Sequence, residues 1–366
     1  MNDTIKISKS FTVGDWKILR PKLLVSDEKW PEAFKVFENR IQSRFFDPIE
    51  IIQSNGKNEG EGFSITLISV VLLEFLAAFE LGKIYKTNKE DISPHEYYSG
   101  IKLLKSFLKS SSVFGSHFDS NTKIQNFYEN IRCGLVHEAR TLKNDVIISE
   151  NSAKNTKIDL LYFSENGEGR LNRDLLLVEL KKHINEYKSK ITGGDTQSRM
   201  RFLLKMDEIS GLKHVWYFIY GSNLCENQLN DRLSELNEKY LFKQRCSLEN
   251  YQLTYNKKSI DGTSKANLLK KENGVVQGIA VLLLENKLDE FTKKYEVGYE
   301  KVEVTIRTEN IDEPLRFKSY TCISNNITSL PPSEDYVSKI IKGANENNLP
   351  ADYIENFLNY PSGLNF

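Results

Sequence analysis

The sequence predicts an α+β protein of two domains: a helical bundle with a small β insertion over residues 1–210, and a strand-rich domain with flanking helices over residues 211–366. The chain has 366 residues, which is long for a single ordinary domain. Apolar residues recur at three- and four-residue spacings in the first half. Short runs rich in β-branched and aromatic residues alternate with turn residues in the second half.

Helical spacing dominates the first half. It covers four segments before residue 140, namely residues 30–45, 63–85, 94–110 and 123–139. Two short strands around a turn are expected next, at residues 144–150 and 157–163. Residues 171–190 then return to helical spacing. The pattern predicts a mostly helical domain that carries a small β insertion.

Short strands dominate the second half. Examples are expected at residues 215–221, 251–256, 274–284, 299–306 and 317–323. Helical segments are expected after Asn223 and over residues 334–345. The stretch between residues 192 and 211 contains turn residues and a short helix, which places the domain boundary near residue 210.

The overall charge does not favour a polyanionic partner. Fifty basic and fifty acidic residues produce a formal net charge of zero. A neutral chain has no general attraction to nucleic acid or to anionic membranes, so an RNA contact would need a local basic patch.

Cysteine usage and the termini predict a soluble cytoplasmic protein with no membrane partner. The four cysteines, at positions 133, 225, 246 and 322, form no CxxC pair, so neither a structural zinc site nor any other metal site is expected. The N-terminus lacks the apolar core of a signal peptide. Residues 63–81 approach membrane-spanning length, but they include Glu74 and Glu80, which favours a buried helix of a bundle.

The most informative segment is the predicted strand that ends in Tyr220-Gly221-Ser222-Asn223. Glycine would let the backbone turn tightly, and Ser222 and Asn223 would begin a helix whose side-chain oxygens and free N–H groups can hold a small anion such as a carboxylate. An ordinary N-capped helix after a strand would show the same four residues, so the segment alone leaves both interpretations open.

The residues that follow, taken in order, resemble the gamma-glutamylcyclotransferase family. The resemblance covers nearly all of the second half, through Leu229, Arg232, residues 248–256, Ser259, residues 261–262, 265–267 and 274–278, Leu288, Asp289, Tyr299, residues 302–304, Ser319, Tyr320, Pro332, Ser333, Tyr336, residues 343–344, Leu349, Pro350 and Tyr353. It implies a small crossed β-barrel with flanking helices. It also implies cyclisation of a gamma-glutamyl group to 5-oxoproline without metal or cofactor.

The same resemblance implies a ligand site for a small gamma-glutamyl or other anionic molecule, formed by Tyr220, Gly221, Ser222, Asn223 and Tyr320.

A catalytic carboxylate is also required, to move a proton from the attacking amine to the leaving amine. In the family this glutamate follows a Leu-Asp pair by three residues, a position occupied here by Thr292 after Leu288-Asp289. A threonine hydroxyl is no base near neutral pH, so the gapless register predicts an inactive domain. A shifted register makes Glu296 the catalytic residue, and Glu290 is a third candidate.

The first half contains a second candidate site, the pair Arg132 and His137. An imidazole that takes a 2′-hydroxyl proton and a guanidinium that stabilises phosphate charge suit metal-independent RNA cleavage. On a regular helix these side chains are about 140° apart, so a shared site would need a helix end or a partner subunit. The alternative is that both side chains bond to helix ends, to Glu61 or to Glu74.

The context of this pair resembles HEPN domains. The resemblance covers residues 25–190 and rests on the bundle, the RxxxxH spacing, the β insertion, and Trp30, Phe34, Arg40, Pro48, Ile49, residues 60–63 and Glu74. It implies a homodimer with both Arg132–His137 pairs facing one cleft. Cys133 stands where the family often has a polar residue, and non-catalytic HEPN domains exist as well.

Three functions follow from these patterns. The leading hypothesis is a HEPN-type ribonuclease effector, of toxin or phage-defence type, in which the cyclotransferase-like domain binds a regulatory ligand. The second is an active gamma-glutamylcyclotransferase that releases 5-oxoproline, with the helical domain serving dimerisation. The third is a pair of non-catalytic binding modules.

Overall fold

The computed structural model describes residues 1–56, 59–149, 159–163, 168–309 and 314–358. The chain forms two compact units. Unit 1 contains Met1–Thr87 and Tyr97–Gly211, and unit 2 contains Asn88–Glu96 and Leu212–Phe366. The mixed α+β class is confirmed, with a closed β-barrel in unit 2.

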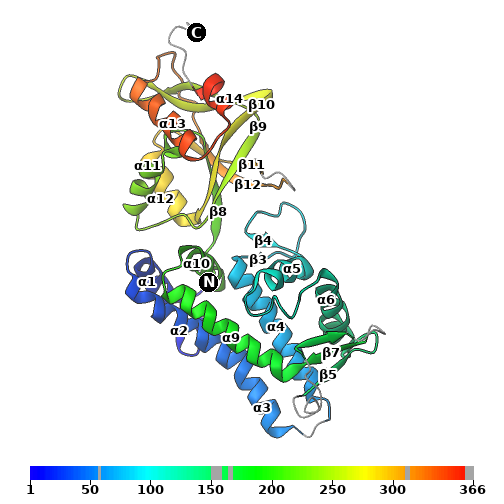
Figure 1. Cartoon of the computed structure of the whole chain (residues 1–366). Helices are drawn as coiled ribbons and strands as arrows, with labels where there is room; N and C mark the ends of the chain where they lie inside the picture. The colour runs from blue at the N-terminus through cyan, green and yellow to red at the C-terminus, as the bar shows by residue number, and fades with distance from the viewer. Residues whose placement is uncertain (57–58, 150–158, 164–167, 310–313, 359–366) are drawn as a thin grey trace. The chain divides into compact units, whose positions relative to one another are not determined.

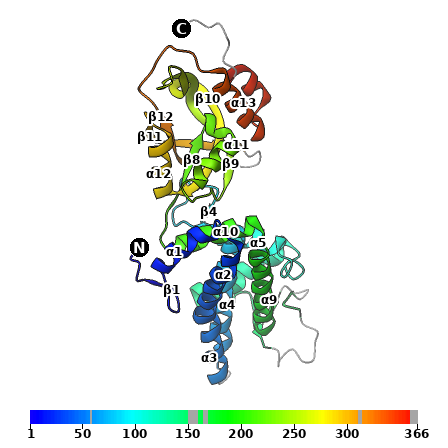
Figure 2. The same ribbon diagram turned by 90° about the vertical axis from the view of Figure 1, so that its left-hand side faces the viewer.

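Unit 1 is built mainly from helices. The long helices α2 (Trp30–Ile41), α4 (Glu61–Leu81) and α9 (Arg173–Thr192) lie side by side (Figures 1 and 2). The shorter helices of this unit are α1 (Val13–Leu23), α3 (Asp47–Asn55), α5 (Gly100–Ser110), α6 (Asn121–Asn126), α7 (Gly134–Glu138) and α10 (Thr196–Ile209).

Aromatic side chains from four helices form the centre of unit 1. The ring centroid of Phe37 on α2 lies 4.7 Å from that of Phe79 on α4 and 5.7 Å from that of Phe202 on α10. It also lies 5.9 Å from the ring of Tyr187 on α9. All four side chains are buried. Tilted aromatic pairs at such separations add to the stabilisation from burial, so these contacts hold the four helices together.

Two helices of unit 1 differ from the sequence-based prediction. The helix expected from residue 94 begins at Gly100, and residues Glu96–Tyr97 instead form strand β4. Proline is favoured in the first turn of a helix, so Pro94 led the sequence pattern to place the start of the helix before Gly100. The helix expected over residues 123–139 is interrupted by a π-helical turn at Phe127–Cys133, between α6 and α7.

The expected β insertion is a three-stranded sheet. Strand β7 (Gly169–Asn172) pairs in parallel with β5 (Val146–Ile148) and antiparallel with β6 (Leu161–Phe163). Part of each expected strand, at residues 150 and 157–158, lies outside the described residues.

Helix α4 is long and apolar enough to cross a membrane by length and composition alone. Of its most apolar 18-residue window, 56% is buried inside the protein. The packing of α4 against α5, α9 and α10 accounts for this burial, and a core helix passes the same compositional test.

Unit 2 contains a closed five-stranded barrel with strand order β10-β8-β12-β11-β9. The strands are β8 (His214–Ile219), β9 (Lys243–Lys258), β10 (Ser264–Leu284), β11 (Glu300–Thr308) and β12 (Arg316–Ile323). Strand β8 runs antiparallel to β10 and parallel to β12. Its near-continuous apolar sequence fits this central place, because both of its faces are covered.

Helices flank the barrel (Figure 1). They are α11 (Glu226–Ser234), α12 (Glu285–Tyr295), α13 (Glu334–Glu346) and α14 (Ala351–Tyr353). Helix α13 packs directly against the turn that follows β8. A Cβ atom at Gly343 would lie 2.2 Å from the backbone of Leu224 and Cys225, so only glycine permits this approach.

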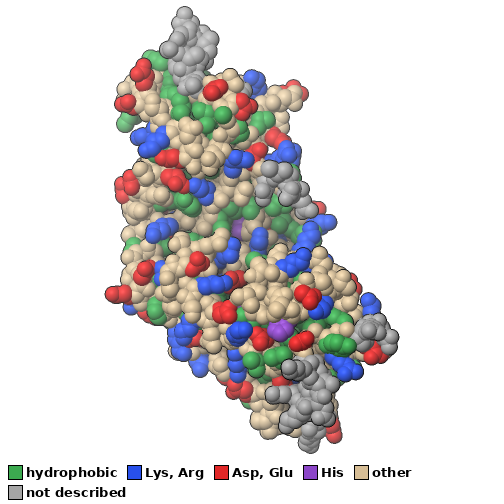
Figure 3. All heavy atoms as spheres, viewed as in Figure 1, with side chains coloured by type: hydrophobic (Ala, Val, Ile, Leu, Met, Phe, Trp, Pro, Cys, Tyr) green, Lys and Arg blue, Asp and Glu red, His purple; other side chains and the backbone are tan. Residues whose placement is uncertain are grey.

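The face of the molecule shown in Figure 3 carries acidic and basic side chains that are interspersed. This distribution agrees with the balanced charge of the sequence.

Candidate functional site

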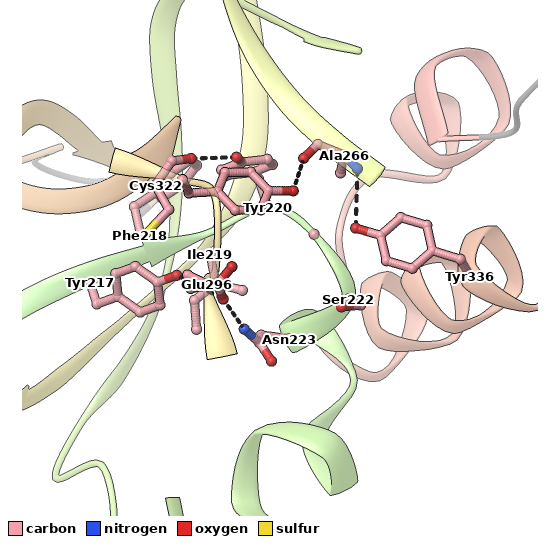
Figure 4. A pocket seen from close by; sticks show the side chains of 12 residues that line it. Tyr217, Phe218, Ile219, Tyr220, Ser222, Asn223, Ala266, Glu296, Cys322 and Tyr336 are labelled. Carbon is pink, nitrogen blue, oxygen red and sulfur yellow. Dashed lines mark hydrogen bonds between the residues drawn. The ribbon is translucent and has the colours of Figure 1, made fainter. Parts of the chain in front are cut away.

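A partly open pocket lies where strand β8 ends, with a cavity volume of about 40 Å³. Its walls come from the end of β8 and the following turn, from the segment after α12, and from β10, β12 and α13 (Figure 4). The lining residues are residues 217–223, Ala266, Glu296, Tyr299, Cys322 and Tyr336. Four of the predicted ligand-binding residues, Tyr220, Gly221, Ser222 and Asn223, therefore meet at one site.

The turn after β8 is a short 3-10 helix at Ser222–Leu224. The first N–H groups of such a turn have no intrahelical partner, which leaves them available to an anion. The sequence expects Gly221 to let the backbone turn tightly, and its φ of −108° lies outside the left-handed region that favours glycine. A Cβ at Gly221 would lie 3.5 Å from Ala266 Cβ and from Tyr336 Oη. The glycine therefore keeps space open in the pocket.

Glu296 is the carboxylate that faces this turn. It lies directly after α12, and Asn223 Nδ2 donates to its Oε1 at 2.7 Å (Figure 4). Tyr217 Oη donates to the same oxygen at 3.3 Å. Both of these bonds engage Oε1.

The other two candidates for the catalytic position lie elsewhere. The hydroxyl of Thr292 donates to the carbonyl of Asp289 within α12, and Glu290 pairs with Lys287 at 2.8 Å on the exposed side of that helix. Neither side chain lines the pocket. The gapless register, which placed Thr292 in the site, was therefore wrong. Helix α12 ends at Tyr295, and Glu296, the next residue, meets the turn after β8.

Asn223 is itself held by two side chains of α11. Arg232 Nη1 donates to Asn223 Oδ1 at 2.7 Å, and Gln228 Nε2 donates to the same oxygen at 3.1 Å. These bonds fix which end of the amide is the acceptor, so Nδ2 must point toward Glu296. Arg232, Asn223 and Glu296 thus form a continuous hydrogen-bonded chain.

Burial and charge set the protonation of Glu296. Burial raises the pKa of its carboxyl above the usual value, and the charge of Arg232 is the strongest influence that opposes this rise. Hydrogen bonds from Tyr217 and Asn223 also favour the ionised form. A carboxyl with a raised pKa is suited to accept and then return a proton near neutral pH.

Tyrosine side chains form much of the remaining wall. Tyr299 Oη donates to the carbonyl of Ala266 at 2.6 Å, and Tyr336 Oη accepts from the Ala266 N–H at 3.1 Å. Tyr220 Oη donates to the carbonyl of Cys322. Burial raises the pKa of Tyr336 to about 12 and that of Cys322 to about 12, so both stay neutral at physiological pH.

Several site residues have no role predicted from the sequence. The resemblance includes Tyr299 and Tyr336 without assigning them to the ligand, and it gives no role to Tyr217, Gln228 or Cys322. Tyr217 could have been suspected, since it lies in the strand that leads into the turn. Tyr320, predicted to bind ligand, is not among the residues that line the pocket. It lies two residues from Cys322 on β12, with Lys301 Nζ 4.7 Å from its ring centroid.

The predicted site in unit 1 has a different arrangement. Arg132 donates to both carboxylate oxygens of Glu74, at 2.7 and 3.1 Å, and these bonds raise its pKa. Its guanidinium also lies 5.3 Å from the ring centroid of Tyr128. His137 lies exposed on α7. The arginine is thus engaged by Glu74, which is the structural alternative that the sequence left open.

Within the described parts of the chain, no group of three or more His, Cys, Asp or Glu side chains is placed to hold a metal ion. The lining of the pocket presents one carboxylate, several hydroxyl groups, the Cys322 thiol and backbone N–H groups.

Replacing Arg232 with glutamine is expected to move the activity of this site to higher pH. The substitution removes the charge that most lowers the pKa of Glu296, so the carboxyl would ionise only at a higher pH. Because the ionised carboxylate is the base, the rising limb of the kcat/KM profile should shift upward in pH, with a smaller effect at alkaline pH.

The pH profile of Arg232→Gln, measured beside Lys294→Gln, checks this expectation. Lys294 is an exposed cation nearby that pairs with Glu235 at 2.7 Å. An unshifted rising limb in Arg232→Gln, or an equal shift in both variants, would contradict the role given to Arg232.

Comparisons with known proteins agree with the site in unit 2. Residues 282–357 match the AIG2-like family. The bovine gamma-glutamylcyclotransferase is 30% identical over 149 residues, an alignment that covers 37% of this chain and 73% of that protein.

Solved structures show partial matches to the same part of the chain. A structure of a gamma-glutamyl cyclotransferase shares 24% identity and covers 42% of this chain and 93% of that chain, with a TM-score of 0.36. A yeast gamma-glutamyl cyclotransferase described as specific to glutathione shares 11% identity over 40% of this chain and 94% of that chain, with a TM-score of 0.32. Through its second unit, the chain belongs to the gamma-glutamylcyclotransferase family.

Proposed function

We propose that unit 2 is an active gamma-glutamylcyclotransferase that releases 5-oxoproline from a gamma-glutamyl amine or peptide. The observation that carries this proposal is the Glu296 carboxylate, held at 2.7 Å by Asn223 of the turn expected to bind the glutamyl group. A carboxylate at this place can transfer a proton. The gapless register offered only Thr292 for that role, and a threonine hydroxyl cannot act as the base. The geometry therefore favours the active cyclotransferase over the ribonuclease effector.

The glutamyl group would be bound at the turn after β8. Its α-carboxylate would accept hydrogen bonds from the first N–H groups of the Ser222–Leu224 turn. The surrounding tyrosine wall excludes water from the reacting amide and lowers the local dielectric, so the few polar contacts of the site act more strongly.

The reaction then needs one base that becomes an acid. Glu296 removes a proton from the α-ammonium group, and the neutral amine nitrogen attacks the gamma-carbonyl carbon. A new carbon–nitrogen bond closes the five-membered ring, and the original amide carbon–nitrogen bond breaks. Glu296 returns this proton to the departing amine nitrogen. The ring nitrogen then loses its second proton, through Glu296, to the released amine, which leaves as an ammonium ion, and the ring is a neutral lactam. The products are 5-oxoproline and a free amine, no water is consumed, and no metal or cofactor enters the scheme.

The direct test is release of 5-oxoproline by the purified full chain from a panel of gamma-glutamyl amino acids, peptides and alkylamides. Release from at least one class would support the proposal, and no release from any of them would count against it.

Unit 1 would serve dimerisation in this proposal, as the sequence suggested for the active cyclotransferase. Sedimentation equilibrium of the full chain checks this role. A monomer at micromolar concentration would contradict dimerisation through unit 1.

The ribonuclease effector remains a prediction from resemblance, with Arg132 and His137 as its residues and RNA as its substrate. Its test is the integrity of total RNA in cells that express the wild type beside His137→Ala. Fragmented RNA and arrested growth in the wild type alone would support a nuclease, with a toxin or defence role as the next question. Intact RNA in both would leave no role for the pair in cleavage, in agreement with the Arg132–Glu74 ion pair.

A further inference from the structure

The short segment that joins helix α12 to strand β11 carries the carboxylate of the pocket. It begins at Glu296, directly after α12, and ends at Tyr299, directly before β11. Packing holds little of this 296–299 segment, because Val297 is 67% exposed and Gly298 is exposed as well. Gly298 also has a φ of +80°, a conformation that favours glycine. The position of Glu296 therefore depends on the hydrogen bonds that its neighbours make.

One of these hydrogen bonds comes from Ser324, the first residue after strand β12. Its Oγ donates to the carbonyl of Gly298 at 2.6 Å and accepts from the N–H of Asn326 at 3.2 Å. Ser324 is 2% exposed, so water does not compete for its hydroxyl. The bond fixes the backbone two residues after Glu296.

Ser324 is in turn held by the side chain of Asn267 on β10. The Asn267 Oδ1 accepts from the Ser324 N–H, and its Nδ2 donates to the Ser324 carbonyl, both at 2.9 Å. Nδ2 also donates to Oδ1 of Asn256 on β9 at 2.9 Å. Asn267 is fully buried, and both of its N–H donors and its acceptor are engaged. A buried polar network that is fully satisfied is rigid, so Ser324 is a firm support for the 296–299 segment.

Neither Ser324 nor Asn267 lines the pocket. The hydrogen bonds of this network lead to the Glu296 carboxylate through the carbonyl of Gly298. A network that served only the stability of the barrel would leave the properties of that carboxylate unchanged when the Ser324 hydroxyl is removed.

We propose that Ser324 is a positioning residue for Glu296. Through the carbonyl of Gly298, it keeps the Glu296 carboxylate on its two hydrogen-bond donors in the pocket. The effect on catalysis rests on the proposed cyclotransferase function, whereas the effect on the carboxylate itself does not. Without the Ser324 hydroxyl, the exposed backbone around Gly298 gains freedom and the carboxylate leaves its donors for part of the time.

The titration of Glu296 in the full chain tests this proposal without a substrate. ¹³C NMR of protein labelled at the glutamate δ-carbons follows the carboxyl, and the signal that is missing in Glu296→Gln identifies it. The bonds from Tyr217 and Asn223 favour the ionised form. Because the pocket walls still bury the carboxyl, losing these bonds in Ser324→Ala should raise the pKa of Glu296 above that of the wild type. An unchanged titration in folded Ser324→Ala would overturn the proposal.

Kinetics with gamma-glutamylglycine give a second readout. Ser324→Ala should lower kcat by about 10–10²-fold, the loss expected when a catalytic group is misplaced by about 1 Å. KM should stay near that of the wild type, because the glutamyl group is assigned to the turn after β8. A rise in KM with an unchanged kcat would overturn the proposal. A wild type that released no 5-oxoproline would count against the proposed function and would leave the titration to decide on Ser324.

Ser264→Ala is the matched control. Ser264 is a fully buried serine at the start of β10, and within the described part of the chain its Oγ has no hydrogen-bond partner. Removing this hydroxyl should leave the titration of Glu296 and kcat as they are in the wild type. Equal effects in Ser264→Ala and Ser324→Ala would overturn the specific role of Ser324.

A second pair of variants covers the case in which Ser324→Ala does not fold. Ser324→Thr and Ser324→Val introduce side chains of nearly the same size, and only threonine keeps the hydroxyl. Ser324→Thr should titrate like the wild type, and Ser324→Val should show the raised pKa of Glu296. The same titration in both variants would overturn the proposal.

Discussion

Glu296→Gln is expected to abolish release of 5-oxoproline by the full chain. Glutamine keeps the size of the side chain and can still meet Asn223 and Tyr217, but it cannot take a proton from the attacking amine. Removing a general acid–base group of this kind lowers kcat by about 10²–10⁴-fold. Binding of the glutamyl group should persist, since it depends on the turn after β8. The measurement is 5-oxoproline formed per enzyme, together with the affinity for an unreacted substrate.

Glu290→Gln is the matched control for this prediction. It makes the same chemical change on the exposed side of α12, where Glu290 pairs with Lys287. Activity near that of the wild type is expected. Loss of activity in Glu290→Gln with full activity in Glu296→Gln would show that Glu290, and not Glu296, is the catalytic carboxylate.

Asn223→Asp is expected to have the second-largest effect. The substitution replaces the Nδ2 donor, which lies 2.7 Å from Glu296 Oε1, by a second carboxylate oxygen. Two carboxylates at this distance repel each other, so the pKa of the pair rises and Glu296 stops being an effective base near neutral pH. The loss in kcat/KM at neutral pH should be about 10²-fold or more, with partial recovery at higher pH, because the ionised base returns there.

The kinetic pH profile checks this expectation, with Asn237→Asp as the control. Asn237 is exposed and lies outside the pocket, so the same added charge there should leave the profile unchanged. A full loss in Asn223→Asp that does not recover with pH would show that Asn223 acts by binding the substrate more than by holding Glu296.

The sequence alone predicted the family of unit 2 and the turn that lines its pocket. The ordered set of residues from Tyr220 to Tyr353 carried the family resemblance, and the strand before Tyr220 is apolar because β8 is covered on both faces. These are local features, since a strand, a turn and a helix start are each determined by a few consecutive residues. For that reason, residue type and order are enough to place Tyr220 through Asn223 together.

The sequence named Glu296 and Glu290 as candidates for the catalytic carboxylate but could not choose between them. Spacing from Leu288-Asp289 selected Thr292, which points away from the pocket. Whether residue 292 or residue 296 faces the turn after β8 depends on where α12 ends and how the following segment returns to β11. That geometry is decided by packing between elements far apart in the chain, and residue spacing does not contain it.

The Arg132–His137 pair in unit 1 also shows that residue spacing does not predict contacts between distant parts of the chain. Spacing linked Arg132 to His137, five residues apart, whereas the structure links Arg132 to Glu74, 58 residues away. A spacing motif states which side chains are available, but the nearest opposite charge is set by how α4 packs against the helices around it.

What the sequence determined by itself is the α+β class, the family of unit 2 and the turn proposed to hold the glutamyl group, because these depend on short-range pattern and residue type. What only the tertiary structure decided is which of the candidate carboxylates faces that turn, and the Arg232–Asn223 chain that orients it. Each of these is a contact between residues brought together by barrel closure and helix packing, and such contacts depend on the whole fold rather than on neighbours in the chain.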